Sequence, residues 1–170
     1  NVTANGTTIK GAGSVVDGES VLGTAVIEKN TEIKGKAKAT ALTIKGATVD
    51  YNSVNSCGAI TVQENATLNM NKSYAAAITV GAQVGNSKTA GTLNINADQS
   101  NAITVKKGNV TIASGKTVNA LTWTENWGAT LTNNGTIKCA ITVPNNGTYV
   151  HNGSVTGDVK VSKAADSNNA

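Results

Sequence analysis

Short runs of alternating apolar and polar residues recur along most of this chain. The phrase Ala-Ile-Thr-Val occurs four times, and near-copies read Ala-Leu-Thr-Ile at 41–44 and Ala-Leu-Thr-Trp at 120–123. Alternation of this kind places successive side chains on opposite faces of an extended strand. The chain never sustains the i, i+3, i+4 apolar spacing of an amphipathic helix, so the sequence predicts an all-β protein.

The phrases recur at a nearly constant spacing. Successive phrases are separated by 18, 18, 25, 18 and 20 residues, counted from the residues that open them: Ala41, Ala59, Ala77, Ala102, Ala120 and Ala140. A weaker copy places Ala25 sixteen residues before Ala41. A second alternating phrase, such as Ala-Thr-Leu-Asn-Met at 66–70, usually follows each first phrase after six to nine residues. After Ala77 the lag is fourteen residues, and we interpret residues 84–91 as a loop insertion.

Two strands in every 18 to 20 residues fit either an antiparallel sandwich or a β-solenoid. A sandwich gives no reason for the same phrase to recur in register, whereas stacked coils place equivalent residues in columns. We therefore predict a single-domain parallel β-helix of six to seven coils, with 16–25 residues per coil. Residues 1–24 are expected to form an N-terminal cap or first irregular coil, 25–161 the repetitive solenoid, and 162–170 a flexible tail or linker. Two inward columns are predicted: Leu42, Ile60, Ile78, Ile103, Leu121 and Ile141, and beside them Ile44, Val62, Val80, Val105, Trp123 and Val143.

The two cysteines provide a test of this register. Cys57 and Cys139 lie four coils apart in the predicted stack. At about 4.8 Å per coil their separation is roughly 20 Å, and disulfide geometry requires less than about 7 Å between Cα atoms. We predict that they do not pair with each other.

The composition disfavours several classes of function. All 14 basic residues are Lys, there is one His, and the ten carboxylates are scattered over the repeat, with only Glu32 and Asp50 loosely sharing a column. Carbohydrate-active β-helices need converging carboxylates, so we predict no catalytic residues, no metal and no cofactor. The net charge of +4 comes from lysines that are not tightly clustered, and the chain contains no Arg. This argues against binding of nucleic acid. No apolar run reaches the roughly 20 residues of a membrane helix, and we expect no membrane insertion of this segment.

Two surface features are candidate ligand-binding sites. The first is an outward threonine strip beside the alanine column, formed by Thr43, Thr61, Thr79, Thr104, Thr122 and Thr142. Such a strip matches a regular lattice such as ice, but threonine also suits ordinary exposed strands. The second is Trp127, in a connection after the inward Trp123. An exposed indole is either a platform for stacking a sugar or a lid over the edge of a core.

The stretch from Gly91 to Val118, GTLNINADQSNAITVKKGNVTIASGKTV, resembles passenger regions of bacterial autotransporters and related large surface adhesins. Those families stack loosely repeated Gly-Thr-Leu-x-Ile and Ile-Thr-Val strands into right-handed β-helices. The resemblance extends over residues 20–161 and is one of repeat texture, so it transfers no functional residue. It implies an extracellular or cell-surface location and a host or neighbouring-cell surface protein or glycan as partner, with self-association as a further possibility. The two cysteines of this chain depart from the pattern of those families, in which cysteines are uncommon.

Together these observations favour a non-catalytic secreted or cell-surface β-solenoid that serves adhesion, display or as a structural stalk. The chain starts at Asn1 without a signal peptide, and we expect a processed protein or a piece of a longer one. Two alternatives remain open: an ice- or lattice-binding protein that uses the outward Thr/Ala strip, and a carbohydrate-binding or carbohydrate-active β-helix.

Overall fold

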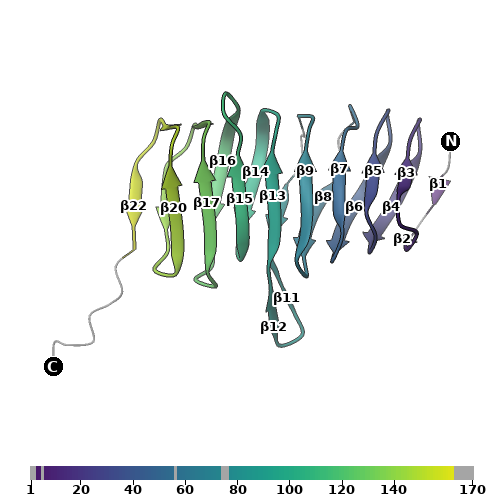
Figure 1. The fold of residues 1–170 in the computed structure, drawn as a ribbon, viewed down its shortest axis with the longest axis horizontal. Coiled ribbons are helices and arrows are strands. Elements are labelled where there is room, and N and C mark those ends of the chain that lie inside the picture. The colour runs from purple at the N-terminus through teal and green to yellow at the C-terminus, as the bar shows by residue number, and fades with distance from the viewer. Residues whose placement is uncertain (1–2, 5, 56, 74–76, 163–170) are drawn as a thin grey trace.

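The computed structural model describes residues 3–4, 6–55, 57–73 and 77–162, and these residues form a parallel β-solenoid with strands and no helix. Successive turns of the chain stack side by side, and the colour in Figure 1 runs in order from one end of the stack to the other. Two sheets enclose the core between them. Every strand pair within these two sheets is parallel, and strands inside each sheet pair with their counterparts in the preceding and following turns.

Sheet A has ten strands, and sheet B has eight. Sheet A consists of β1 (Thr3–Ala4), β2 (Thr7–Ile9), β4 (Val21–Ile27), β6 (Lys38–Lys45), β8 (Ala59–Gln63), β10 (Ile78–Val80), β14 (Gln99–Val105), β16 (Thr117–Trp123), β18 (Thr136–Ile137) and β21 (Ser154–Val155). Sheet B consists of β3 (Ser14–Val16), β5 (Thr31–Ile33), β7 (Thr48–Tyr51), β9 (Ala66–Met70), β13 (Gly91–Ile95), β15 (Gly108–Ile112), β17 (Ala129–Asn133) and β20 (Gly147–His151). A parallel pair, β19 (Ile141–Val143) with β22 (Val159–Val161), lies beside them at the C-terminal end.

The predicted inward columns are confirmed as far as β16. Ile60 pairs with Leu42 on one side and with Ile78 on the other, and Ile78 pairs in turn with Ile103. These side chains are at most 1% exposed. Sheet B supplies the opposite wall of the core through columns such as Val49, Leu68, Leu93, Val110 and Leu131. Aliphatic residues of similar size therefore stack on one another at most turns and fill most of a narrow core.

The predicted number of six to seven coils is too low, because the eight strands of sheet B correspond to about eight turns. The additional turn comes from the N-terminal end, where β1, β2 and β3 pair in parallel with β4 and β5. Its sequence lacks the Ala-Ile-Thr-Val phrase, so repeat spacing alone did not reveal it. Pairing of the backbone and burial of a few aliphatic side chains suffice to form a turn whose sequence lacks the repeated phrase.

The predicted alignment of Ala25 with Ala41 is wrong by one residue. Ala25 pairs with Leu42 and is fully buried, whereas Ala41 pairs with Thr24 on the outward face. A shift of one residue moves a side chain to the other face of a strand. Burial of Ala25 and Ile27 therefore determines the register here, and the identity of the alanines does not.

The predicted insertion after β10 is an antiparallel hairpin of β11 (Ala82–Val84) and β12 (Ser87–Thr89). It projects from one edge of the solenoid (Figure 1). Pairing resumes on both sides of it, since Ile78 pairs with Ile103 and Gly91 with Ala66. The longer spacing of 25 residues is thus accommodated outside the stack.

The connection after β14 is much shorter and lies at the same edge. Only Lys106 and Lys107 separate β14 from β15. Gly108 has a φ of 115°, and a Cβ atom on it would lie 1.9 Å from the carbonyl oxygen of Gly91. Only glycine fits that position, and this keeps the connection tight enough to bring its two lysines beside the hairpin.

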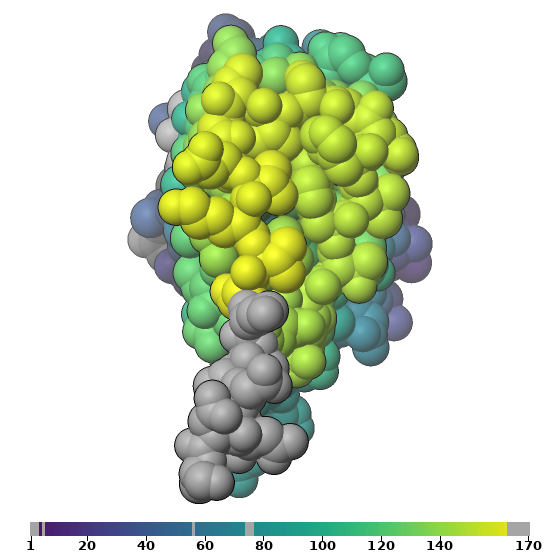
Figure 2. All heavy atoms as spheres, turned by 90° about the vertical axis from the view of Figure 1, so that its left-hand side faces the viewer, coloured from purple at the N-terminus to yellow at the C-terminus, as the bar shows by residue number. Residues whose placement is uncertain are grey.

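The C-terminal end of the stack leaves residues of the core columns open to solvent. Val159 and Val161 continue the columns of Ile141 and Val143 but are 45% and 73% exposed. Figure 2 views the molecule from this end, with the last turns in yellow and yellow-green. His151 pairs with the buried Asn133 at an inward position, and it is exposed because no further described turn covers it. Of the predicted tail 162–170, Ser162 bonds to Val143 through its amide, and 163–170 lie outside the described residues.

Candidate functional site

The threonine strip of sheet A exists as a continuous column for five of its six predicted members. Thr43, Thr61, Thr79, Thr104 and Thr122 are successive register partners. At about 4.8 Å per turn they cover roughly 19 Å. Thr142 does not join the ladder, because it lies in β19 and pairs with Lys160. Strand β16 pairs instead with β18, through Thr117 and Val118, so the extra residues between β18 and β19 interrupt the column.

Sheet B carries a second outward array that the sequence analysis did not single out. Two outward positions on each of the six strands β7, β9, β13, β15, β17 and β20 are filled mainly by Thr and Asn. The first column comprises Thr48, Thr67, Thr92, Asn109, Thr130 and Thr148, and the second Asp50, Asn69, Asn94, Thr111, Thr132 and Val150. The array is therefore wider than the strip on sheet A. The signal was present in the second phrases, whose polar positions repeat as faithfully as their apolar ones.

Two asparagine ladders run along sheet B and its following turn. In one, Asn94 donates to Asn69 at 2.8 Å and Asn69 donates to Asp50 at 2.7 Å. In the other, each amide again donates to the residue one turn back, through Asn96, Asn71, Asn52 and Glu32 at 2.9, 3.0 and 2.9 Å. Each ladder ends at a carboxylate, which accepts without needing to donate. The ladders hold neighbouring turns together along the axis.

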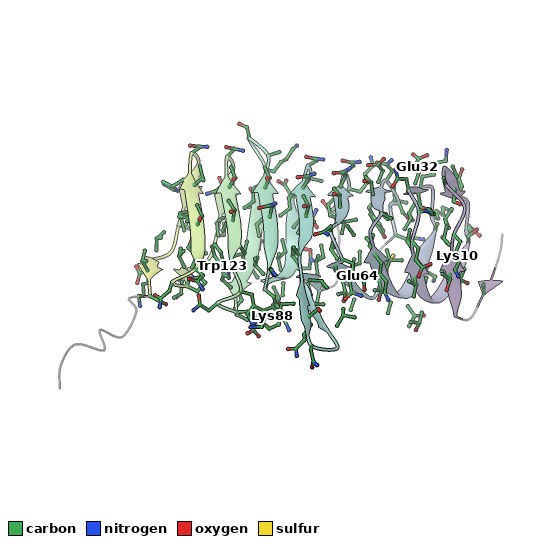
Figure 3. The ribbon with its side chains drawn as sticks, turned by 60° about the horizontal axis from the view of Figure 1, so that its bottom comes forward. Lys10, Glu32, Glu64, Lys88 and Trp123 are labelled. Carbon is green, nitrogen blue, oxygen red and sulfur yellow. The ribbon has the colours of Figure 1, made fainter. Side chains whose placement is uncertain are left out.

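Trp127 lies at the edge from which the hairpin projects, within the connection between β16 and β17. The Nζ atom of Lys88, from β12, lies 5.1 Å from the centroid of the indole ring, and that of Lys106 lies 6.0 Å from it. Lys107 donates through Nζ to the carbonyl oxygen of Lys88 at 2.8 Å. Figure 3 places Lys88 on this edge, on the side of the solenoid away from Glu32. Connections from three successive turns therefore contribute to one group, which we name the Trp127 cluster: Trp127, Lys88, Lys106 and Lys107.

The lysines of the Trp127 cluster have no acidic partner within 4.0 Å among the described residues. Lysines elsewhere do pair, for example Lys36 with Glu19 at 3.1 Å. Trp127 is itself half-buried. Cations over the face of an indole are attracted by its π electrons, so the tryptophan retains the lysine side chains at this edge without neutralising them.

Glu32 and Asp50 come together as the sequence suggested. They are register partners and line a cavity of about 320 Å³ on sheet B. Each already accepts a hydrogen bond from an asparagine of the ladders, and Glu32 also lies 3.5 Å from the Nζ atom of Lys34. The pair is thus arranged as the acceptor end of two structural ladders. Among the described residues no group of three or more His, Cys, Asp or Glu side chains is placed to hold a metal ion.

The cysteines are unpaired, as predicted. Cys57 is buried, with its Sγ atom 3.4 Å from the hydroxyl oxygen of Tyr51. Burial raises the pKa of the Cys57 thiol, and its hydrogen bonds with Tyr51 and with the backbone of Ala39 only partly oppose this. Cys139 accepts from the Leu121 amide at 3.3 Å at the irregular bend before β19. The burial of Cys57 and the direction of its pKa shift are those of a packing group and not of an activated thiolate.

Comparisons of the chain with known protein families, curated proteins and solved structures give no match. The β-solenoid architecture is shown by the pairing of the strands, and the resemblance to surface adhesins stays a prediction. Among the described residues there is no helix with the length and apolar character needed to cross a membrane.

Proposed function

We propose that this β-solenoid is a non-catalytic module of a secreted or cell-surface protein that serves adhesion, display or as a stalk. The observation that supports the proposal is the repetition of outward polar residues on both sheets, in register from turn to turn. A stack of about eight turns at about 4.8 Å each extends roughly 35 Å. Ladder hydrogen bonds between turns make such a stack stiff, which suits a part that holds a surface away from its attachment.

The partner that we propose is a protein or glycan on a host or neighbouring cell, with self-association as a second mode. Extended polar faces with protruding connections present many shallow contacts, and binding by repeated weak contacts suits attachment through multiple copies. The hairpin β11–β12 extends this surface sideways from the stack.

The proposal is tested first by location. Antibodies against the folded chain should label intact cells of the source without permeabilisation, and protease added outside the cells should remove the signal. Beads coated with the folded chain should then adhere to a panel of cells better than beads coated with the same chain after denaturation. Labelling confined to permeabilised cells, together with equal adherence of the two kinds of bead, would contradict the proposal.

A second candidate function, lattice or ice binding, is favoured by the in-register column of five threonines on sheet A. Flat, regularly spaced methyl and hydroxyl groups match the repeat of a crystalline surface. The folded chain would show thermal hysteresis, and the double substitution Thr79→Tyr and Thr104→Tyr would abolish it by breaking the flatness of the strip. Absence of hysteresis in the unmodified chain eliminates this candidate.

A further inference from the structure

The positive charge of the chain is concentrated in its middle turns. Residues 65–140 contain six Lys and two carboxylates, which gives +4, while residues 1–64 balance six Lys against six carboxylates and residues 141–170 balance two against two. The whole formal excess of +4 thus belongs to the turns that carry the Trp127 cluster. A surface of one sign attracts ligands of the opposite sign and accelerates their encounter.

The Trp127 cluster adds local chemistry to this field. The ammonium groups of Lys88 and Lys106, from two successive turns, lie over one half-buried indole from the next turn, and Lys107 is bound beside them to the Lys88 carbonyl. None of the three has a described carboxylate within 4.0 Å. Lysine ammonium groups donate up to three hydrogen bonds each. Lys107 uses one of its own on the Lys88 carbonyl. Donors therefore remain for an anionic group held beside the ring.

The indole of Trp127 indicates what kind of group the ligand presents beside its anionic group. The face of an aromatic ring is electron-rich and attracts groups whose hydrogens are partly positive. The axial C–H groups of a pyranose ring present such a face, with a shape that matches an indole. A sugar that also carries a carboxylate or sulfate would satisfy the ring and the lysines at once.

We infer that the Trp127 cluster is a binding site for acidic polysaccharides, in which Trp127 stacks on a sugar ring and Lys88, Lys106 and Lys107 bind its carboxylate or sulfate. This inference rests on the proposed adhesive function and names its partner. Single-stranded nucleic acid fits less well, because proteins that bind it present successive aromatic residues along a basic groove, and the cluster has one indole.

The test measures binding of the full chain to a carboxylated polysaccharide (polygalacturonate), a sulfated one (heparin), a neutral one (dextran) and an oligothymidylate. We expect one or both acidic polysaccharides to bind and dextran and the oligonucleotide not to bind. Trp127→Ala should weaken binding about tenfold or more, the effect that loss of one stacking aromatic side chain has in proteins that bind single-stranded nucleic acid. Trp127→Tyr should retain most of the binding. The double substitution Lys88→Gln and Lys106→Gln should weaken binding and reduce its dependence on salt.

The matched control is the double substitution Lys34→Gln and Lys36→Gln, which removes the same charge from lysines that already have acidic partners. It should leave binding unchanged. Emission from Trp127 should change on titration with the polysaccharide, and this change should disappear in Trp127→Tyr, which separates contact with the ring from support of the hairpin. Circular dichroism verifies that each variant is folded.

Failure of the unmodified chain to bind either acidic polysaccharide would overturn the inference. Equal weakening by the cluster and control substitutions would do the same, since binding would then follow net charge alone, and so would equal binding of the oligonucleotide. If coated beads still adhere to cells in that case, the proposed adhesive function stands and only the ligand assignment falls.

Discussion

Replacement of Ile78 by alanine tests the register on which the whole description of the surfaces depends. Ile78 is fully buried and lies between Ile60 and Ile103 in its column. The substitution removes three carbon atoms, and at about 0.8 kcal/mol per buried methylene the lost transfer free energy is about 2.4 kcal/mol. The neighbours in the column are held at the spacing of the backbone ladder, so they cannot close the space, and a cavity contribution is added.

We therefore expect Ile78→Ala to lower the free energy of unfolding by about 3 to 4 kcal/mol, within the range measured for buried aliphatic residues. Its neighbour Thr79 provides the matched control because its side chain is on the outward face. Thr79→Ala should change stability by less than about 0.5 kcal/mol, as surface substitutions usually do.

Urea unfolding followed by far-ultraviolet circular dichroism measures both variants. The midpoint should fall for Ile78→Ala with no change in the slope m, because the surface exposed on unfolding is nearly the same. Both tryptophans lie C-terminal to Ile78, so the midpoint from their emission should coincide with the midpoint from circular dichroism if the turns unfold together. A larger effect of Thr79→Ala than of Ile78→Ala would place the strand one residue out of register and refute the description of both faces.

Three further predictions follow from single contacts. Asn71→Ala removes a donor and an acceptor from the middle of one ladder and should cost about 1 kcal/mol in urea unfolding, because water replaces only part of these hydrogen bonds; no change in midpoint would argue against a stabilising ladder. Native Cys57 should react slowly with a thiol reagent at pH 8 and quickly in urea. Because the pKa of its thiol is higher in the folded state, the contribution of Cys57 to stability should be complete below the unfolded pKa and should decline as pH rises above it. Cys57→Ala should remove that decline. Gly147→Ala should destabilise by about 1 to 3 kcal/mol and shift the emission of Trp123, because a Cβ atom there would lie 2.7 Å from that indole; unchanged emission would contradict this contact.

The repeats made the core predictable from sequence. Ile60, Ile78 and Ile103 occupy equivalent places in copies of one phrase, and in a solenoid equivalence in sequence becomes adjacency in space. The same argument correctly separated the two cysteines. It failed for Ala25, where the copy is weak and burial of aliphatic side chains determines the register.

The candidate site was predictable only in part. The sequence repeat predicted the threonine column correctly as far as Thr122. Thr142 lies outside the column because of an irregular bend before β19, which the repeated phrase does not reveal. The lysines around Trp127 were not found, because Lys88 and Trp127 are 39 positions apart in the chain and meet through the length and direction of separate connections. Repeat spacing contains no information on the direction in which a hairpin projects from the stack.

The detour between β10 and β13 leaves the strands on either side of it in place, and this has a consequence for how such a molecule can change. Segments grafted at that position would protrude without requiring any compensating change in the aliphatic interior. Evolution, or a protein engineer, can therefore vary the length and chemistry of that projection independently of the scaffold that carries it.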